Sequence, residues 1–419
     1  ERVARGVLSV SAEEPSACRV LAGVNLHRGE LDGAVEWARR GYEIDPSVSE
    51  AAANLASVLV ASGQGEEAER MARRAIELDA ELVSGWVNLG LACRLRRRSH
   101  EAVDAFRRAV QLQPGHYGAW TNLGNVLTEV GEFAEAVECI RRALSIRPGL
   151  SAAETNLGNA LLKLGRLDES IAAYQRSLVS CPGDIETEYN LGIAYEHSGR
   201  LSEAEAVQRG VVDRDPSHAR AINNLGVVLK LQGRIAEAAE QFERSAELSP
   251  DSTAAVANRL ATTLCQSDVS VEQLLETHRQ SSLGLWGQLE SNRPRVSSER
   301  QPESPIRVGF VSPDFGQHPV GRFLLGAFEA LDPDRLQAVC FSDRIQVDAF
   351  TDRFRSVSFE WFDIRGRSDE LVAEWVEAAG VDVLIDLAGH TGRHRLGVFA
   401  RRPAPLQMTW IGYPSTTGL

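Results

Sequence analysis

The feature that most constrains this chain is a spacing of 34 residues that repeats over its first 260 residues. Proline, glycine and alanine each keep this period at their own positions, and Arg97 is an exception that stands where other units have glycine. Asparagine recurs at Asn54, Asn88, Asn122, Asn156, Asn190, Asn224 and Asn258. Such a period indicates a solenoid, because one short unit buries its apolar face only by stacking on its neighbours.

A single unit, such as residues 117–150, has the pattern of two amphipathic helices. Apolar residues such as Trp120 recur at helical spacing in each half of the unit. Gly131 stands where a left-handed residue ends the first helix, and Pro148 stops the second. The small Gly124 predicts that the two helices approach each other closely.

The recurring tryptophan, leucine, glycine, alanine and proline resemble the tetratricopeptide repeat. The resemblance implies an α-solenoid domain over residues 15–265, with about seven units and a degenerate helix at 252–264. In such arrays the first helix of each unit lines a concave face, and the seven periodic asparagines, here called the asparagine ladder, fall in that helix. Their amides both donate and accept hydrogen bonds, which favours binding of a protein or peptide backbone. The alternative is that each asparagine bonds to the neighbouring helix and serves packing alone.

The composition is that of an ordinary soluble chain, with a formal net charge of −13. This charge argues against a nucleic-acid partner, and no apolar run reaches the length of about 18 residues that a membrane span needs. The six cysteines form no CxxC pair or cysteine–histidine cluster, so we expect no metal, and free thiols in a reducing, cytoplasmic compartment. The chain begins at Glu1, and we expect residues to be missing before it.

The 34-residue period is lost after Cys265. Residues 266–304 are expected to connect two domains, with a helix at 271–289 that caps the last repeat and a polar linker around 291–305. From 305 to 419, short apolar runs alternate with helical patterns, which predicts one Rossmann-like lobe with a doubly wound sheet. The expected strands are 306–311, 336–341, 359–362, 381–387 and 407–411, and the expected helices are 323–331 and 369–379.

Two polar loops follow strands of this sheet, at the carboxyl ends where ligands gather. The first is SPDFGQHPVGR, in which His318 is either an acid/base group or a loop histidine without a chemical role. The second is AGHTGRHR, residues 388–395, whose hydrogen-bonding groups suit a sugar or phosphate, or else begin a solvated basic helix. Neither loop has the Walker A or GxGxxG pattern, and no carboxylate–histidine spacing recommends a metal.

Three segments stand in order behind the repeats: RVGFVSPDFGQHPVGRF, DVLIDLAGHTG and RRPAPLQMTWIGYPSTTG. Together they resemble the O-linked N-acetylglucosamine transferase family, glycosyltransferase family 41. The resemblance implies an inverting enzyme of α + α/β fold and GT-B type, without a cofactor or essential metal. It moves N-acetylglucosamine from UDP-N-acetylglucosamine to Ser or Thr of proteins held by the repeats. The resemblance places His318 in the active site, and at the sugar-nucleotide cleft it places Gly389, His390, Thr391, Pro414 and Thr416.

Two departures from the family pattern matter. Ser415 stands where the family usually has glycine, and the chain ends at Leu419, before the second lobe that carries most UDP contacts. We therefore expect residues 1–419 to be an N-terminal portion that does not transfer sugar by itself. Two other hypotheses stay open: a relative that uses another nucleotide sugar, such as a protein O-fucosyltransferase, and a non-catalytic peptide-binding scaffold. A homodimer formed through the repeats is a further arrangement that the resemblance allows.

Overall fold

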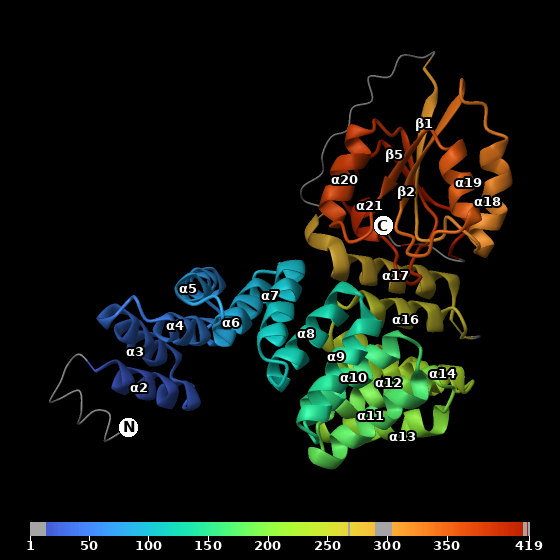
Figure 1. Cartoon of the computed structure of the whole chain (residues 1–419). Coiled ribbons are helices and arrows are strands. Elements are labelled where there is room, and N and C mark those ends of the chain that lie inside the picture. The colour runs from blue at the N-terminus through green and yellow to red at the C-terminus, as the bar shows by residue number, and fades with distance from the viewer. Residues whose placement is uncertain (1–13, 267–268, 290–303, 414–416, 418–419) are drawn as a thin grey trace. The chain divides into compact units, whose positions relative to one another are not determined.

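The computed structural model describes residues 14–266, 269–289, 304–413 and 417. The chain divides into two compact units, Glu1–Val207 and Gln208–Leu419, whose elements are labelled in Figure 1. The helices that precede the division are α2 (Pro15–His27), α3 (Leu31–Ile44), α4 (Ser49–Ala61), α5 (Gly65–Leu78), α6 (Val83–Leu95), α7 (Ser99–Leu112), α8 (Tyr117–Val130), α9 (Phe133–Ile146), α10 (Ser151–Lys163), α11 (Leu167–Ser180) and α12 (Ile185–His197). The division falls within α13 (Leu201–Arg214). The helices that follow it are α14 (Ala219–Leu231), α15 (Ile235–Leu248), α16 (Thr253–Thr263), α17 (Val271–Trp286) and the 3-10 turn η1 (Gly287–Leu289).

Glycine lets the two helices of a repeat approach closely, as the sequence predicts. A Cβ on Gly124 of α8 would lie 2.4 Å from Cγ1 of Ile140 in α9. The equivalent glycines lie against the rings of larger residues, in the pairs Gly90 with Phe106, Gly158 with Tyr174 and Gly226 with Phe242. These large side chains are fully buried, so each of these four hairpins packs a ring or branched chain against bare backbone.

The end of the first helix in most repeats is a left-handed residue. Gly29, Gly63, Gly131, Gly165, Gly199 and Gly233 have φ between 73° and 88°. Arg97 occupies the same register with a φ of 58°, a conformation that costs a side-chain-bearing residue about 1–2 kcal/mol. The repeat geometry therefore imposes the turn even where the sequence departs from glycine.

The sheet of the second unit has the strand order β3-β2-β1-β4-β5, and every neighbouring pair is parallel. The strands are β1 (Ile306–Ser312), β2 (Leu336–Ser342), β3 (Glu360–Asp363), β4 (Val383–Asp386) and β5 (Leu406–Thr409). The helices between them are α18 (Pro319–Glu329), α19 (Ala349–Val357), α20 (Asp369–Ala378) and α21 (Leu396–Ala400). This is one Rossmann-like lobe, as expected from the alternation of strand and helix patterns.

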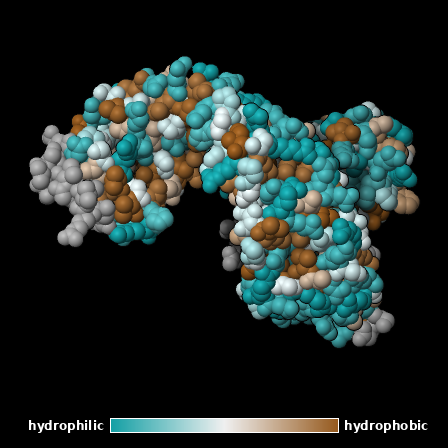
Figure 2. All heavy atoms as spheres, turned by 60° about the horizontal axis from the view of Figure 1, so that its bottom comes forward, coloured by the Kyte–Doolittle hydropathy of each residue, from teal (hydrophilic) through white to brown (hydrophobic). Residues whose placement is uncertain are grey.

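Helices cover both faces of this sheet (Figure 1). On one face, alternate strand residues such as Phe310 pack with Phe328 of α18 and Phe354 of α19. On the other face, the intervening residues such as Phe341 pack with Val372 of α20. The near-continuous apolar strands thus follow from burial on both sides. On the surface shown in Figure 2, apolar residues lie dispersed among polar ones.

The structure differs from the predicted elements in several places. Helix α18 begins at Pro319, four residues before the predicted start, because His318 caps it and proline suits a first helical position. The predictions omitted α19 and α21, and they made β4 too long at both ends. The helix predicted at 271–289 is α17 followed by η1. The predicted domain limits of 15–265, 266–304 and 305–419 stay predictions.

Candidate active site in the sheet lobe

The strand order brings the two predicted loops to the same edge of the sheet. Strand β1 lies between β2 and β4, and Val311 near its end pairs with Asp386 at the end of β4. The chain leaves β1 toward α18 on one face and leaves β4 toward α21 on the other face. Connections that diverge in this way open a crevice at the carboxyl ends of the two strands, where doubly wound folds bind ligands.

His318 stands at the end of the first loop, as the N-cap of α18. Its Nδ1 accepts a long hydrogen bond of 3.4 Å from the backbone N–H of Val320 and lies 3.5 Å from Oδ2 of Asp314. The side chain is 43% exposed, so the ring is open to a ligand in solution. Burial raises the pKa of Asp314, although His318, Arg344 and Arg393 act to lower it. The site therefore combines an accessible imidazole with a neighbouring carboxyl.

The loop that carries His318 is fixed by close backbone contacts and by the loop after β2. A Cβ on Gly321 would lie 2.2 Å from the carbonyl oxygen of Gly316. The N–H of Gln317 donates to Oδ2 of Asp348 at 2.8 Å, and Arg344 pairs with the same oxygen at 2.6 Å. Burial acts to raise the pKa of Asp348, but backbone N–H donors and Arg344 hold it well below its usual range. Asp348 is therefore charged while it fixes the loop.

A buried carboxylate at the end of β4 holds the backbone of the second loop. Asp386 accepts hydrogen bonds from the backbone N–H groups of Ala388 at 3.1 Å and Gly389 at 2.7 Å. Burial raises the pKa of Asp386 against the effect of these two bonds. Gly389 has a φ of 56°, and a Cβ there would lie 2.2 Å from Cβ of Tyr413. The hydroxyl of Thr391 donates to the carbonyl of Ala388 at 2.7 Å, which closes the turn.

His390 points away from solvent into a cluster of rings. It is 2% exposed, and its Nε2 donates to the carbonyl of Thr417 at 2.8 Å. Its ring stacks on Trp286 of α17, with centroids 6.2 Å apart, and lies edge-on to His278 and Tyr413 at 5.6 Å each. Burial lowers the pKa of His390 to about 4, so the ring is neutral near pH 7. The cleft assignment of His390 stays a prediction, and the structure gives its ring a supporting position beneath the loop.

The loop after β5 lies directly on the loop after β4. A Cβ on Gly412 would lie 1.7 Å from the carbonyl oxygen of Leu387, so only glycine allows this contact. Tyr413 follows it and is 9% exposed. Pro414 and Thr416, two of the predicted cleft residues, lie outside the described residues.

Sequence reasoning missed the contact between α17 and these loops. Nε2 of His278 lies 2.9 Å from the hydroxyl of Tyr413, which is 135 residues later in the chain. The only sequence signal was a histidine in a predicted capping helix, and no spacing rule connects it with Tyr413. Long-range pairs of this kind emerge only from the fold.

The asparagine ladder lies in the first helix of each repeat, and its members differ in surroundings. Asn88 is buried, and its Nδ2 donates to the carbonyl of Ala53 in the preceding repeat at 2.8 Å. Nδ2 of Asn258 donates to Oδ1 of Asn223 at 2.9 Å. The other members are partly exposed: Asn54, Asn122, Asn156, Asn190 and Asn224. Packing thus accounts for Asn88, and a ligand-binding role for the ladder stays a prediction.

The first unit also has a cavity between its N-terminal helices. The cavity has a volume of about 460 Å³ and includes Asn54 and Ser57 of α4 in its lining. Leu26 of α2, Trp37 of α3 and Val58 of α4 contribute apolar surface to it. The exposed start of the ladder is therefore bordered by apolar side chains.

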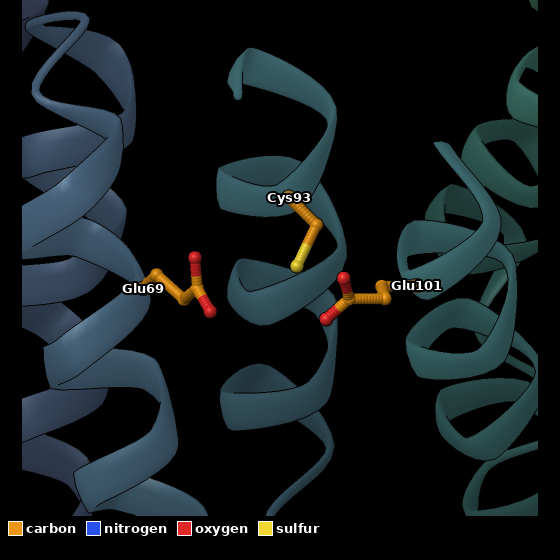
Figure 3. A group of neighbouring side chains, drawn as sticks. All are labelled: Glu69, Cys93 and Glu101. Carbon is orange, nitrogen blue, oxygen red and sulfur yellow. The ribbon is translucent and has the colours of Figure 1, made fainter. Parts of the chain in front are cut away.

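One group in the described repeats has the spacing of metal ligands, namely Glu69, Cys93 and Glu101 (Figure 3). The carboxylate of Glu69 already accepts hydrogen bonds from three guanidinium groups, those of Arg73, Arg96 and Arg98. Arg98 also pairs with Glu101, and burial raises the pKa of the Cys93 thiol. Because positive charge surrounds both carboxylates and the thiol is protonated, this group is better suited to an ion-pair network than to a metal.

No helix in the described parts of the chain is long and apolar enough to cross a membrane.

The described residues combine helical repeats with a Rossmann-like lobe whose two polar loops follow the neighbouring strands β1 and β4, and comparison with known proteins shows where this combination occurs. Residues 289–419 match the model of glycosyl transferase family 41. Tetratricopeptide repeat models match residues 15–40, 54–117, 116–178, 158–199 and 189–253. The repeats thus match tetratricopeptide models and residues 289–419 match glycosyl transferase family 41, so the resemblance to the O-linked N-acetylglucosamine transferase family is confirmed.

Several relatives carry matching names. Over 181 residues the chain is 36% identical to a probable UDP-N-acetylglucosamine–peptide N-acetylglucosaminyltransferase, SPINDLY, of Arabidopsis thaliana, covering 41% of this chain and 19% of that protein. It is 30% identical over 140 residues to the Caenorhabditis elegans UDP-N-acetylglucosamine–peptide N-acetylglucosaminyltransferase, covering 31% of this chain and 12% of that protein. Among solved structures, a Thermobaculum terrenum O-GlcNAc transferase mutant aligns with a TM-score of 0.50 and 26% identity, over 72% of this chain and 52% of that one. The chain therefore spans about a fifth or less of the curated relatives it matches.

Proposed function

We propose that this chain forms the acceptor-binding repeats and the N-terminal catalytic lobe of a protein O-N-acetylglucosaminyltransferase. The observation that carries the proposal is the placement of the His318 loop and the Gly389–Thr391 loop after the paired strands β1 and β4, within the segment that matches family 41. The donor is UDP-N-acetylglucosamine, the sugar nucleotide in the names of the relatives. The acceptor is a Ser or Thr hydroxyl of a protein bound by the repeats.

In the proposed reaction the acceptor oxygen bonds to the anomeric carbon of the sugar while the bond from that carbon to the UDP oxygen breaks. The hydroxyl proton must leave as the new bond forms, and His318 is the accessible imidazole that can receive it. Asp314, whose Oδ2 lies 3.5 Å from Nδ1, is placed to stabilise the positive charge of the ring after proton transfer. The negative charge that develops on UDP needs nearby donors, and the exposed turn after Gly389 offers backbone N–H groups. No cofactor or metal has a part in this scheme.

Two further parts of the proposal concern the surroundings of the protein. The six cysteines are free, and four of them are buried, as suits a reducing compartment such as the cytoplasm.

Self-association through the repeats is tested by light scattering of the purified chain, where the mass of a dimer supports it and the mass of a monomer rejects it.

The experiment uses the natural protein that carries this sequence, with radiolabelled UDP-N-acetylglucosamine and a protein acceptor. His318→Asn retains an N-cap for α18, because asparagine caps helices well, but it removes the basic nitrogen. We expect kcat to fall by about 10²–10⁴-fold. The matched control is His116→Asn, which changes a histidine N-cap of repeat helix α8 and leaves transfer largely intact. Undiminished turnover in His318→Asn would remove this residue from the chemistry, and absence of transfer by the unchanged protein would contradict the function.

A further inference from the structure

We infer that helix α17 is the support that positions the loops after β4 and β5, and that His278 is a positioning residue for sugar transfer. The inference rests on the proposed function, because those loops border the crevice assigned to the sugar nucleotide. Helix α17 (Val271–Trp286), which carries His278, lies outside the three segments that carry the family resemblance.

The hydrogen bonds of His278 have a defined direction. Its side chain is fully buried, with Nδ1 at 2.7 Å from the carbonyl of Leu274 and Nε2 at 2.9 Å from the hydroxyl of Tyr413. A carbonyl only accepts, so Nδ1 carries the hydrogen and Nε2 accepts from the Tyr413 hydroxyl. The ring is thereby neutral and makes two hydrogen bonds, which fix its orientation.

The same face of α17 makes two further contacts at successive turns. Ser282, four residues after His278, donates to the carbonyl of Thr417 at 2.6 Å. That carbonyl also accepts from Nε2 of His390 at 2.8 Å, so it joins α17 to both loops. Trp286, four residues further, stacks on His390 with an interplanar angle of 25°. Residues at this spacing lie on one side of a helix, and α17 therefore presents a continuous face to the loops.

These contacts reach the backbone of the crevice through Tyr413. Its Cβ lies so close to Gly389 that a Cβ on the glycine would be 2.2 Å away. The position of Tyr413 therefore sets the position of the turn at Gly389, and the His278 hydrogen bond sets the position of Tyr413. A 1 Å displacement of positioning groups can cost about 10²-fold in rate. A shift of Tyr413 is therefore expected to lower the rate of sugar transfer.

Helix α17 is itself anchored to the last repeat. Nη2 of Arg259 in α16 donates to Oγ of Ser281 at 2.5 Å, and Nη1 of the same residue pairs with Glu243 of α15 at 3.2 Å. A rigid support is required for precise positioning. The last repeat thus holds α17 in place, and α17 in turn holds the two loops in place.

The test compares His278→Phe, which keeps a ring of similar size, with His278→Gln, which restores an acceptor for Tyr413. Donor KM, acceptor KM and kcat are measured separately in the natural protein. We expect His278→Phe to reduce kcat/KM for the donor by about tenfold, the effect of losing one hydrogen bond with its orienting role. We expect no change in acceptor KM, and recovery to within about threefold of the original value in His278→Gln.

Tyr413→Phe removes the same hydrogen bond from the other side. The double variant with His278→Phe should be no worse than either single variant, because both changes delete one interaction. Ser245→Ala is the control for general destabilisation, since it removes a buried hydrogen bond to Ala219 between α15 and α14 at 2.9 Å. Fully additive losses, or equal changes in donor and acceptor kinetics for His278→Phe and Ser245→Ala, would overturn the positioning role.

A second measurement separates this inference from the proposed function. Hydrogen exchange is followed in residues 386–395 and 410–413, with β1 and β2 as internal references. We expect His278→Phe to accelerate exchange in those two loops by about tenfold and to leave the reference strands unchanged. If the unchanged protein transfers no sugar, the function fails and exchange alone decides whether α17 positions the loops. Unaltered loop exchange in a folded His278→Phe variant would refute the inference whatever the activity.

Discussion

Arg97 shows how a repeat can impose its geometry on an unsuitable residue. Its φ of 58° is positive, as are the φ values of the six glycines at the equivalent positions of other repeats. Replacement Arg97→Gly removes the clash between Cβ and the backbone, and we expect it to raise the free energy of unfolding by about 1 kcal/mol. The measurement is urea unfolding of the purified chain. Arg97→Ala removes the same charge but keeps a Cβ, so an equal gain in that variant would show that strain is not the cause.

Two asparagines of the ladder allow packing and ligand binding to be distinguished. Asn88→Ala leaves the Ala53 carbonyl without its buried donor, and we expect a loss of about 1–3 kcal/mol in unfolding free energy. Asn122 is partly exposed, so Asn122→Ala should change stability by less than about 0.5 kcal/mol. If the ladder binds acceptor backbone, Asn122→Ala raises acceptor KM while Asn88→Ala acts mainly on stability. Acceptor KM unchanged in Asn122→Ala, Asn156→Ala and their combination would favour the packing alternative.

Among the elements, sequence patterns predicted the periodic parts well. The repeat helices, the five parallel strands and helix α20 follow from hydrophobic periods of 3.6 and 2 residues and from glycine and proline positions. Helix α21 was missed because five residues are too few for a period to be visible. Helix α19 was missed although Asp348 and Thr351 form a capping box at its start. The site was predicted only as two loops, because its support by α17 depends on contacts across 135 residues of sequence.

The junction between α17 and the loops should make stability depend on pH. Burial lowers the pKa of His390 from 6.5 to about 4, and burial also lowers the pKa values of His278 and His394. Because the unfolded chain binds protons more readily, the contribution of His390 is present in full above pH 6.5 and is lost as pH falls toward 4. The loss amounts to about 3 kcal/mol for His390 alone. Asp314 and Asp386, whose pKa values are raised, act in the opposite direction over the acidic range.

This pH dependence is measured as the difference between the unchanged chain and His390→Gln in urea unfolding from pH 7.5 to 4. Glutamine retains a donor for the Thr417 carbonyl but does not titrate. We expect the unchanged chain to lose stability relative to the variant as pH falls from 6.5. Parallel pH curves for the two proteins would mean that His390 is not held in its neutral form by the fold.

At the scale of the whole molecule, the described residues contain a tetratricopeptide array and a Rossmann-like lobe with two polar loops at one edge of its sheet. The repeats offer partly exposed asparagines and a cavity of about 460 Å³ in the first unit. The lobe offers His318, the Gly389 turn and their supporting contacts, but its first loop has no glycine-rich phosphate-binding pattern. Under the proposed function, acceptor binding and sugar chemistry therefore belong to separate parts of the sequence.

We expect residues 1–419 by themselves to bind acceptor peptide without transferring sugar. Sugar transfer needs donors on the leaving diphosphate as well as a base on the acceptor, and neither polar loop of the lobe has a glycine-rich phosphate-binding pattern. Peptide binding is measured by fluorescence anisotropy, and transfer by incorporation of label from UDP-N-acetylglucosamine. Addition of the C-terminal lobe of a family 41 relative should restore some transfer, and His318→Asn should abolish that restored activity. Measurable transfer by residues 1–419 alone would contradict this expectation.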